Sequence, residues 1–217
     1  KEDEYFHHRW FVDETVANRV EESLKKLYGS LSDEALIPES EIISNFLDTV
    51  KDVSDKYKND EILKRWLSIS KHVGRNPLGE WGVAQSPNIK AKGMRDFAYL
   101  AIRRNGSPMH FTEVAKAIKV LFDREAHVAT CHNELIKDSR FVLVGRGMYG
   151  LKEWGHTGGV VRDVIVSVLK DAKTSLSKED IVKGVLARRI VKPNTILVNL
   201  QNNKYFKKDK EGKYQAL

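Results

Sequence analysis

Polar side chains on two short helical segments are of the types that bond to nucleic acids. In residues 128–138, Cys131 and Leu135 fall on the apolar face. With these two residues facing the core, the residues on the outward face are Thr130, His132, Asn133 and Lys137. In a second segment, Ile196 and Leu200 point inward, which leaves outward Thr195, Val198, Asn199 and Asn202. Such side chains bond to base edges or phosphates, so both helices are candidates for DNA contact, although exposed amides are also common on helices that bind nothing.

Basic side chains follow each helix, in segments with the composition of a β-hairpin. Arg140 precedes the first hairpin, and Arg146 lies at its tip between two glycines. The second hairpin carries a group of lysines: Lys204, Lys207, Lys208, Lys210 and Lys213. Phosphate contacts need charge and reach but little fixed geometry, and we interpret these cations in that way. The alternative is that the lysines only protect a hairpin edge from aggregation.

Residue sets that carry out catalysis are missing from the sequence. His127 and His132 lie near each other on one helix, without a carboxylate or thiol to complete a metal site. Cys131 has the helical phase of a core residue rather than of a nucleophile. No glycine loop of the P-loop or Rossmann type is present. We therefore expect a protein that is not an enzyme and that uses no cofactor or metal.

A spacing pattern that occurs three times explains how these segments are positioned. Leu135 is followed at offsets of 6, 12 and 14 by Phe141, Gly147 and Tyr149. The same offsets link Leu200 to Phe206, Gly212 and Tyr214, and Leu67 to Val73, Gly79 and Trp81. Upstream, each copy has an apolar residue followed five positions later by a β-branched one: Ile37 and Ile42, Met109 and Val114, Leu176 and Ile181. Shared spacing over a unit of roughly 65 residues indicates one small fold in tandem.

Each copy is predicted to form three helices and then a hairpin, the layout of a winged helix-turn-helix. In the middle copy we expect helices over 95–104, from about 111, and over 128–138 with Val128 inward, then a hairpin over 141–151. In the last copy, Ser177 and Asp180 have the spacing of a helix-capping pair. In the first copy, Gly29 is expected to end the first helix. Its hairpin around 76–81 is weak, so we expect a reduced or missing wing, and an ordinary helical segment is the alternative.

The fold class expected is thus mainly α with small β-wings, in tandem winged helix-turn-helix modules. The predicted domains are the first repeat (1–90), the middle repeat (91–155) and the last repeat (156–217). The first repeat has 13 Lys and Arg against 17 Asp and Glu, the middle repeat 11 against 7, and the last repeat 13 against 6. The basic excess of the last two repeats favours a polyanion as partner; a lysine-rich solvated surface is the alternative.

Cysteine content and hydropathy bear on the compartment. The single Cys131 argues against a disulfide framework and fits a reducing compartment. No apolar run approaches the ~18 residues of a membrane span, and no signal peptide is visible. We expect a cytoplasmic protein without membrane contact. Because the sequence begins at Lys1 rather than Met, we expect it to be part of a longer protein.

The middle repeat resembles the HARE-HTH family of winged-helix domains. The resemblance covers residues 92–154 and rests on the segment Met109-His-Phe-Thr-Glu-Val-Ala and on the run from His132 to Leu151, which contains R-F-x-x-x-G-R-G-x-Y-x-L. The family occurs in the delta subunit of bacterial RNA polymerase, in some restriction endonucleases and in chromatin regulators. Segments such as Gly79-Glu-Trp-Gly82 resemble bacterial sigma-factor-like proteins that carry this domain. The resemblance implies a transcription-linked role at the bacterial nucleoid and no catalytic residue.

These observations favour a bacterial transcription factor that binds double-stranded DNA through the last two repeats. Two other functions remain open at this point. The repeats are alternatively a scaffold that docks on RNA polymerase, with the basic face meeting an acidic protein surface. They are alternatively the targeting part of a restriction-type nuclease whose catalytic domain lies elsewhere.

Overall fold

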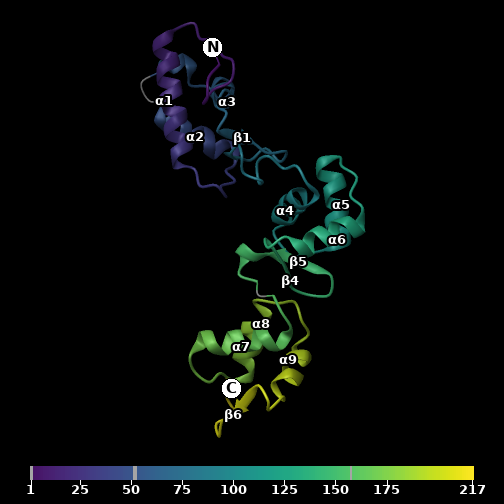
Figure 1. Cartoon of the computed structure of the whole chain (residues 1–217). Coiled ribbons are helices and arrows are strands. Elements are labelled where there is room, and N and C mark those ends of the chain that lie inside the picture. The colour runs from purple at the N-terminus through teal and green to yellow at the C-terminus, as the bar shows by residue number, and fades with distance from the viewer. Residues whose placement is uncertain (1, 51–52, 157) are drawn as a thin grey trace. The chain divides into compact units, whose positions relative to one another are not determined.

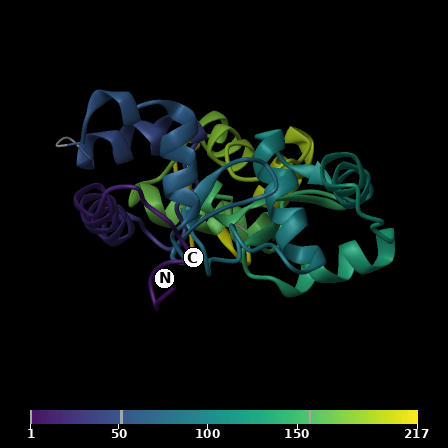
Figure 2. The ribbon, with the colours of Figure 1, turned by 90° about the horizontal axis from the view of Figure 1, so that it is seen from above.

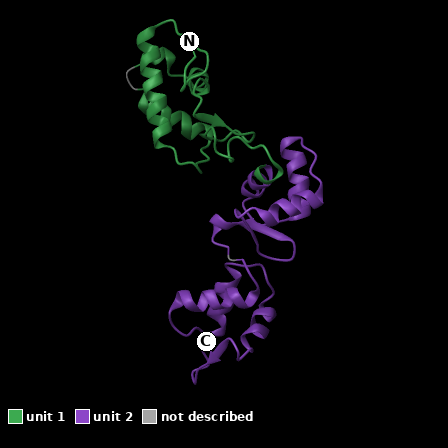
Figure 3. Cartoon of the chain, in the orientation of Figure 1, with its two compact units in different colours: residues 1–96 green, residues 97–217 purple. Residues whose placement is uncertain are grey.

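The computed structural model describes residues 2–50, 53–156 and 158–217. The chain is mainly helical with small antiparallel sheets, and the prediction of that class is confirmed. It forms two compact units, Lys1–Asp96 and Phe97–Leu217 (Figure 3). The boundary between the units falls within the helix α4 (Met94–Asn105). The three-domain division of the sequence stays a prediction.

The first unit consists of helices followed by a hairpin. Its elements are α1 (Glu14–Ser30), α2 (Glu39–Thr49), the short 3-10 helix η1 (Asp55–Tyr57), α3 (Asp60–Ser68), β1 (Val73–Arg75) and β2 (Trp81–Val83). The helix α2 packs against both α1 and α3 (Figures 1 and 2). Asp13 caps α1, because its carboxylate accepts hydrogen bonds from the amides of Thr15 (2.8 Å) and Val16 (3.3 Å). The core is apolar, with Leu24, Ile42 and Leu67 almost fully buried.

The second unit contains twice the order of three helices followed by an antiparallel hairpin. After α4 come β3 (Met109–His110), α5 (Phe111–Phe122), α6 (Val128–Lys137), β4 (Phe141–Leu143), β5 (Met148–Leu151) and η2 (Lys152–Trp154). There follow α7 (Val161–Ala172), α8 (Lys178–Leu186), α9 (Pro193–Leu200), β6 (Phe206–Lys208) and β7 (Tyr214–Ala216). Ser177 caps α8, as predicted, because its Oγ accepts a hydrogen bond from the amide of Asp180 (3.1 Å). The hairpins β4–β5 and β6–β7 are both antiparallel.

The three repeats place their matched residues alike. The leucine in the last turn of the third helix is buried in each: Leu67, Leu135 and Leu200. The residue that opens the hairpin and the aromatic residue of its second strand are also buried: Val73 and Trp81, Phe141 and Tyr149, Phe206 and Tyr214. Each upstream apolar residue pairs with that aromatic residue as a short extra strand or bridge: Ile37 with Trp81, Met109 with Tyr149, and Leu176 with Tyr214. Residues at matched positions of the spacing pattern therefore have the same burial and pairing in the three repeats. The pairing of the upstream apolar residue was not predicted from the sequence.

The repeated glycine of each hairpin is needed for its backbone conformation. Gly79, Gly147 and Gly212 have φ of 86°, 67° and 85°, a region that favours glycine. In the first and last repeats a side-chain oxygen three residues earlier closes the turn. Asn76 Oδ1 accepts hydrogen bonds from the amides two and four residues later (2.9 and 3.0 Å), and Asp209 Oδ1 does the same (2.9 and 2.8 Å).

Three local predictions were wrong. The hairpin of the first repeat is neither reduced nor missing, because β1 and β2 pair over as many residues as β6 and β7, and the side chain of Asn76 closes the turn. Val128 is 42% exposed rather than inward, because α6 begins there and the core does not cover the helix end. Gly29 does not end the first helix, which continues through Ser30.

Candidate nucleic-acid interface

The outward face of α6 carries part of the predicted DNA-contact set. Thr130, Asn133 and Lys137 are exposed. Lys137 lies 3.8 Å from Glu134 on its own helix, at the outer limit of an ion pair. Cys131 and Leu135 are buried on the opposite face, as predicted. The helix therefore presents two neutral polar side chains and one cation, which is a modest charge for a groove contact.

His132 is engaged within the fold, and its contact with DNA stays a prediction. Its ring stacks on Phe111 with centroids 4.2 Å apart and an interplanar angle of 20°. The ring also meets the edge of Tyr149 at 5.8 Å. Phe111 in turn contacts His110, whose Nδ1 lies 2.7 Å from the hydroxyl of Thr112. His132 thus joins an aromatic cluster that ties α6 to α5 and to β5, and only part of its ring is left for a ligand.

Arg140 is engaged within the fold. Its guanidinium donates to both carboxylate oxygens of Asp138 at 2.7–3.1 Å, and it lies over the ring of Tyr99 at 5.0 Å. The Tyr99 hydroxyl donates to Glu153 (3.0 Å), and burial, together with this carboxylate, raises the pKa of Tyr99 above its usual value. These contacts hold the start of β4 against α4 and η2. Arg140 is accordingly a packing residue, in contrast to Arg146, which is exposed at the tip of the same hairpin.

The third helix of the last repeat is only weakly polar. Thr195 is exposed, but Asn199 is partly buried and its amide donates to the carbonyl oxygen of Thr195 (2.8 Å). Val198, on the outward face, is 66% exposed. An amide that already bonds to its own helix has less capacity for a base edge. The sequence interpretation treated these outward positions as equal, whereas the structure separates Thr195 from Asn199.

The hairpin β6–β7 gathers the strongest positive charge among the predicted residues. Lys204, Lys207 and Lys208 are exposed, as is Lys210. In the part of the chain that the structure describes, Lys207, Lys208 and Lys210 have no carboxylate within ion-pair distance, whereas Lys213 pairs with Glu211 (2.9 Å). Asp209, the acid of the turn, is occupied by backbone amides. The hydrogen bond from the amide of Lys213 is the main cause that lowers the pKa of its carboxyl group.

Sequence reasoning missed a second group of cations, where the middle and last repeats meet within the second unit. Arg189 Nη1 donates to the carbonyl oxygens of Leu143 (3.1 Å) and Gly159 (2.7 Å). The amide of Ile190 donates to Val144 O (2.8 Å). The available signal was the run Arg188-Arg-Ile-Val-Lys-Pro193, a basic segment directly before a helix that begins with proline. This segment contacts the middle repeat through Arg189 and Ile190, and a contact between repeats cannot be predicted from a local sequence pattern.

Other chemical features of the described residues are few. Among them, no group of three or more His, Cys, Asp or Glu is arranged to hold a metal ion. The thiol of Cys131 is buried, and burial raises its pKa to about 11. None of the helices that the structure describes has the length and apolar character required to cross a membrane.

Comparison with known proteins gives no information on the function of these residues. No protein-family model, curated protein or solved structure matches the chain.

Proposed function

We propose that the chain binds double-stranded DNA and that the hairpin β6–β7 supplies its main phosphate contacts. The observation that carries this proposal is the group of exposed lysines on and around that hairpin, of which Lys207, Lys208 and Lys210 meet no carboxylate in the described residues. Phosphate oxygens are bound by such flexible cations without strict geometry. Among the described residues, no neighbouring carboxylate competes with a polyanion for these lysines.

The order of elements supports tandem winged helix-turn-helix modules as the framework. In each repeat the third helix is followed directly by the hairpin, and a bridge joins the hairpin to the segment before the second helix. In winged helix-turn-helix proteins the third helix enters the major groove and the wing reaches the backbone. The exposed Thr130, Asn133 and Lys137 of α6 are in the position of such a helix.

The resemblance of residues 92–154 to HARE-HTH domains implies a role in bacterial transcription at the cytoplasmic nucleoid, and the proposal includes that role. RNA polymerase is the further partner that this resemblance implies. The function proposed is non-catalytic and uses no cofactor. Of the two alternatives, docking on a protein is favoured by one specific observation, the pocket between the repeats that is described below.

Titration of the chain against three partners tests the proposal. A labelled random-sequence duplex, the corresponding single strand and core RNA polymerase are compared at several salt concentrations. We expect the duplex to bind with an affinity that falls steeply with salt, because released counterions drive phosphate binding. Binding to the polymerase alone, with no salt-sensitive binding to the duplex, overturns the proposal.

A further inference from the structure

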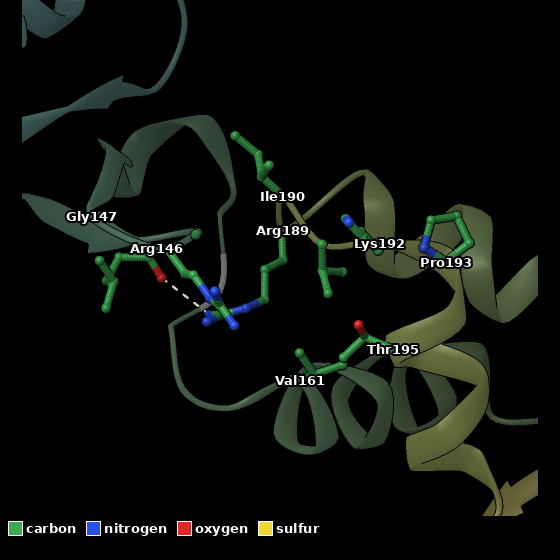
Figure 4. A pocket seen from close by; sticks show the side chains of 11 residues that line it. Arg146, Gly147, Val161, Arg189, Ile190, Lys192, Pro193 and Thr195 are labelled. Atoms are coloured by element: carbon green, nitrogen blue, oxygen red, sulfur yellow. Dashed lines mark hydrogen bonds between the residues drawn. The ribbon is translucent and has the colours of Figure 1, made fainter.

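A pocket of about 870 Å³ lies where the middle and last repeats meet in the second unit (Figure 4). One side is the turn between β4 and β5, which contributes Arg146 and Gly147. The other side is the segment from Arg189 to Thr195, which includes the start of α9. Val161, at the start of α7, also lines it. The pocket exists only because both repeats contribute to it.

Hydrogen bonds to backbone carbonyl oxygens fix the two sides of this pocket relative to each other. Arg189 Nη1 donates to the carbonyl oxygens of Leu143 and Gly159, at 3.1 and 2.7 Å; the bond to Leu143 is the dashed line of Figure 4. The amide of Ile190 donates to Val144 O at 2.8 Å. A binding site whose walls are held before the ligand arrives loses less entropy on binding.

The lining combines aliphatic side chains with cations. Leu143 is 43% and Ile190 51% exposed, although both are large apolar residues. Arg146, Arg189 and Lys192 bring three positive charges, and the lining residues include no carboxylate. This combination indicates a ligand that is apolar at its centre and negatively charged around it.

Arg189 is prepared to bind a carboxylate. Both of its known hydrogen bonds use Nη1. In the residues that the structure describes, its Nε and Nη2 donate to no acceptor, and together they form the edge of a guanidinium that pairs with a carboxylate through two parallel hydrogen bonds. Because Nη1 is already held, little freedom of the side chain remains to be lost.

We propose that this pocket binds an acidic peptide segment of a protein partner, through one bulky apolar side chain flanked by Asp or Glu. The apolar side chain lies against Leu143 and Ile190, and the flanking carboxylates pair with Arg189, Arg146 and Lys192. A sugar–phosphate backbone gains nothing from the aliphatic wall. An unstacked base is bound in proteins chiefly by aromatic side chains, and the lining has none. The site goes beyond DNA binding and does not use the lysines of β6–β7.

A random peptide display library, selected on the full chain, tests this site. Selected peptides are counter-selected against the double variant Leu143→Ser, Ile190→Ser, which changes only half-exposed side chains. Val198→Ser is the matched control, since Val198 is 66% exposed on α9 and does not line the pocket. Circular dichroism verifies that each variant is folded. The best peptide is then titrated against every variant and against Arg189→Lys.

We expect the selected peptides to share a Leu, Ile, Phe or Trp within a run of Asp and Glu. Ile190→Ser should weaken binding by about tenfold, which corresponds to the removal of one well-packed aliphatic side chain from the interface. Arg189→Lys should weaken it as well, since lysine cannot form the paired hydrogen bonds, whereas Val198→Ser should have no effect. The pocket variants Ile190→Ser and Arg189→Lys should leave duplex binding unchanged.

Three results overturn the proposal. One is that no peptide is enriched on the parent chain over the double variant. Another is that the enriched peptides lack either the acids or the apolar residue. The third is that Ile190→Ser weakens duplex binding as strongly as peptide binding, which assigns the pocket to the DNA surface. The peptide result does not depend on duplex binding. If the parent chain does not bind the duplex, the proposed DNA function fails, while the comparison of peptide binding between the parent and the variants still tests the pocket.

Discussion

Cationic side chains of the second unit differ in how much of their hydrogen-bonding capacity the fold already uses. Arg140 directs its guanidinium to Asp138 and to the ring of Tyr99. Arg189 uses one nitrogen for two carbonyl oxygens and keeps an edge for a ligand. Lys207 and Lys208 meet no acid among the described residues. The cations therefore differ in what they can offer a ligand: Arg140 is engaged in packing, whereas the proposed carboxylate and phosphate contacts rest on Arg189 and on the two lysines.

Substitution of Arg140 should affect stability rather than binding. Arg140→Met removes charge-assisted hydrogen bonds to Asp138, whose side chain is only 12% exposed. We expect the free energy of unfolding to fall by about 1–3 kcal/mol. Arg146→Met, at the exposed tip of the same hairpin, serves as control and should leave stability unchanged. Urea denaturation measures both, and an equal effect of the two variants contradicts the packing role of Arg140.

The thiol of Cys131 should react slowly in the folded protein. It is buried, and burial raises its pKa to about 11, so the reactive thiolate is scarce near neutral pH. We expect an aromatic disulfide reagent at pH 8 to modify Cys131 much more slowly in the native chain than in denaturant. Rapid modification without denaturant is incompatible with the packing of α6 described above.

At the scale of elements, two glycines with positive φ lie in different surroundings, one in the β4–β5 turn and one after α4. Gly147 has φ of 67°, and a Cβ atom added there would lie 2.5 Å from His110 Nε2. Gly106 has φ of 71°, but no atom lies within 4 Å of an added Cβ. A side chain at either position would strain the backbone to a similar extent. Only at Gly147 would it also clash with a neighbouring residue.

This difference predicts unequal effects of the same substitution. Gly106→Ala should cost about 1–2 kcal/mol from the left-handed backbone alone. Gly147→Ala should cost at least about 1 kcal/mol more, because the imidazole of His110 must move. Thermal or urea unfolding of the two variants gives the comparison. Equal destabilisation contradicts the close approach of the β4–β5 turn to His110 and Phe111.

The repeated spacing predicted the elements well, because it samples positions that the core fixes. Leu135, Phe141 and Tyr149 are buried as their counterparts in the last repeat are, so apolar identity at a fixed offset was enough. The hairpin of the first repeat was misjudged because Asn76 closes its turn through side-chain hydrogen bonds, which the strand composition does not reveal. The stacking of His132 on Phe111 and the pairing of Arg140 with Asp138 could not be predicted from the sequence, because both contacts depend on tertiary packing.

For the whole molecule, the two units differ in charge. Residues 1–96 have 15 Lys and Arg against 18 Asp and Glu, and residues 97–217 have 22 against 12, so the basic excess lies in the second unit. The core of the first unit is formed by its own residues, from Phe6 to Trp81. Nonspecific DNA affinity follows from clustered positive charge, so the second unit should supply it.

Separate fragments test this division. Residues 91–217 should bind a random duplex with the same salt dependence as the full chain, and residues 1–90 should not bind detectably. Circular dichroism establishes that each fragment is folded before fluorescence anisotropy with the duplex. Binding by the acidic fragment, or loss of binding by the folded basic one, shows that charge alone does not locate the DNA surface.

The most direct measurement of the central claim is the salt dependence of duplex binding by the double variant Lys207→Ala, Lys208→Ala. If the hairpin β6–β7 holds phosphates, the variant should bind all duplexes more weakly, and the slope of log affinity against log salt should flatten by about one unit for each phosphate that the variant no longer neutralises. Lys25→Ala, Lys26→Ala removes the same charge from α1 and should leave the slope unchanged. Asn133→Ala should cost about 1–3 kcal/mol only on a preferred sequence, and only if α6 reads bases. A Lys207, Lys208 variant that binds duplex DNA with the affinity and slope of the parent chain contradicts the account.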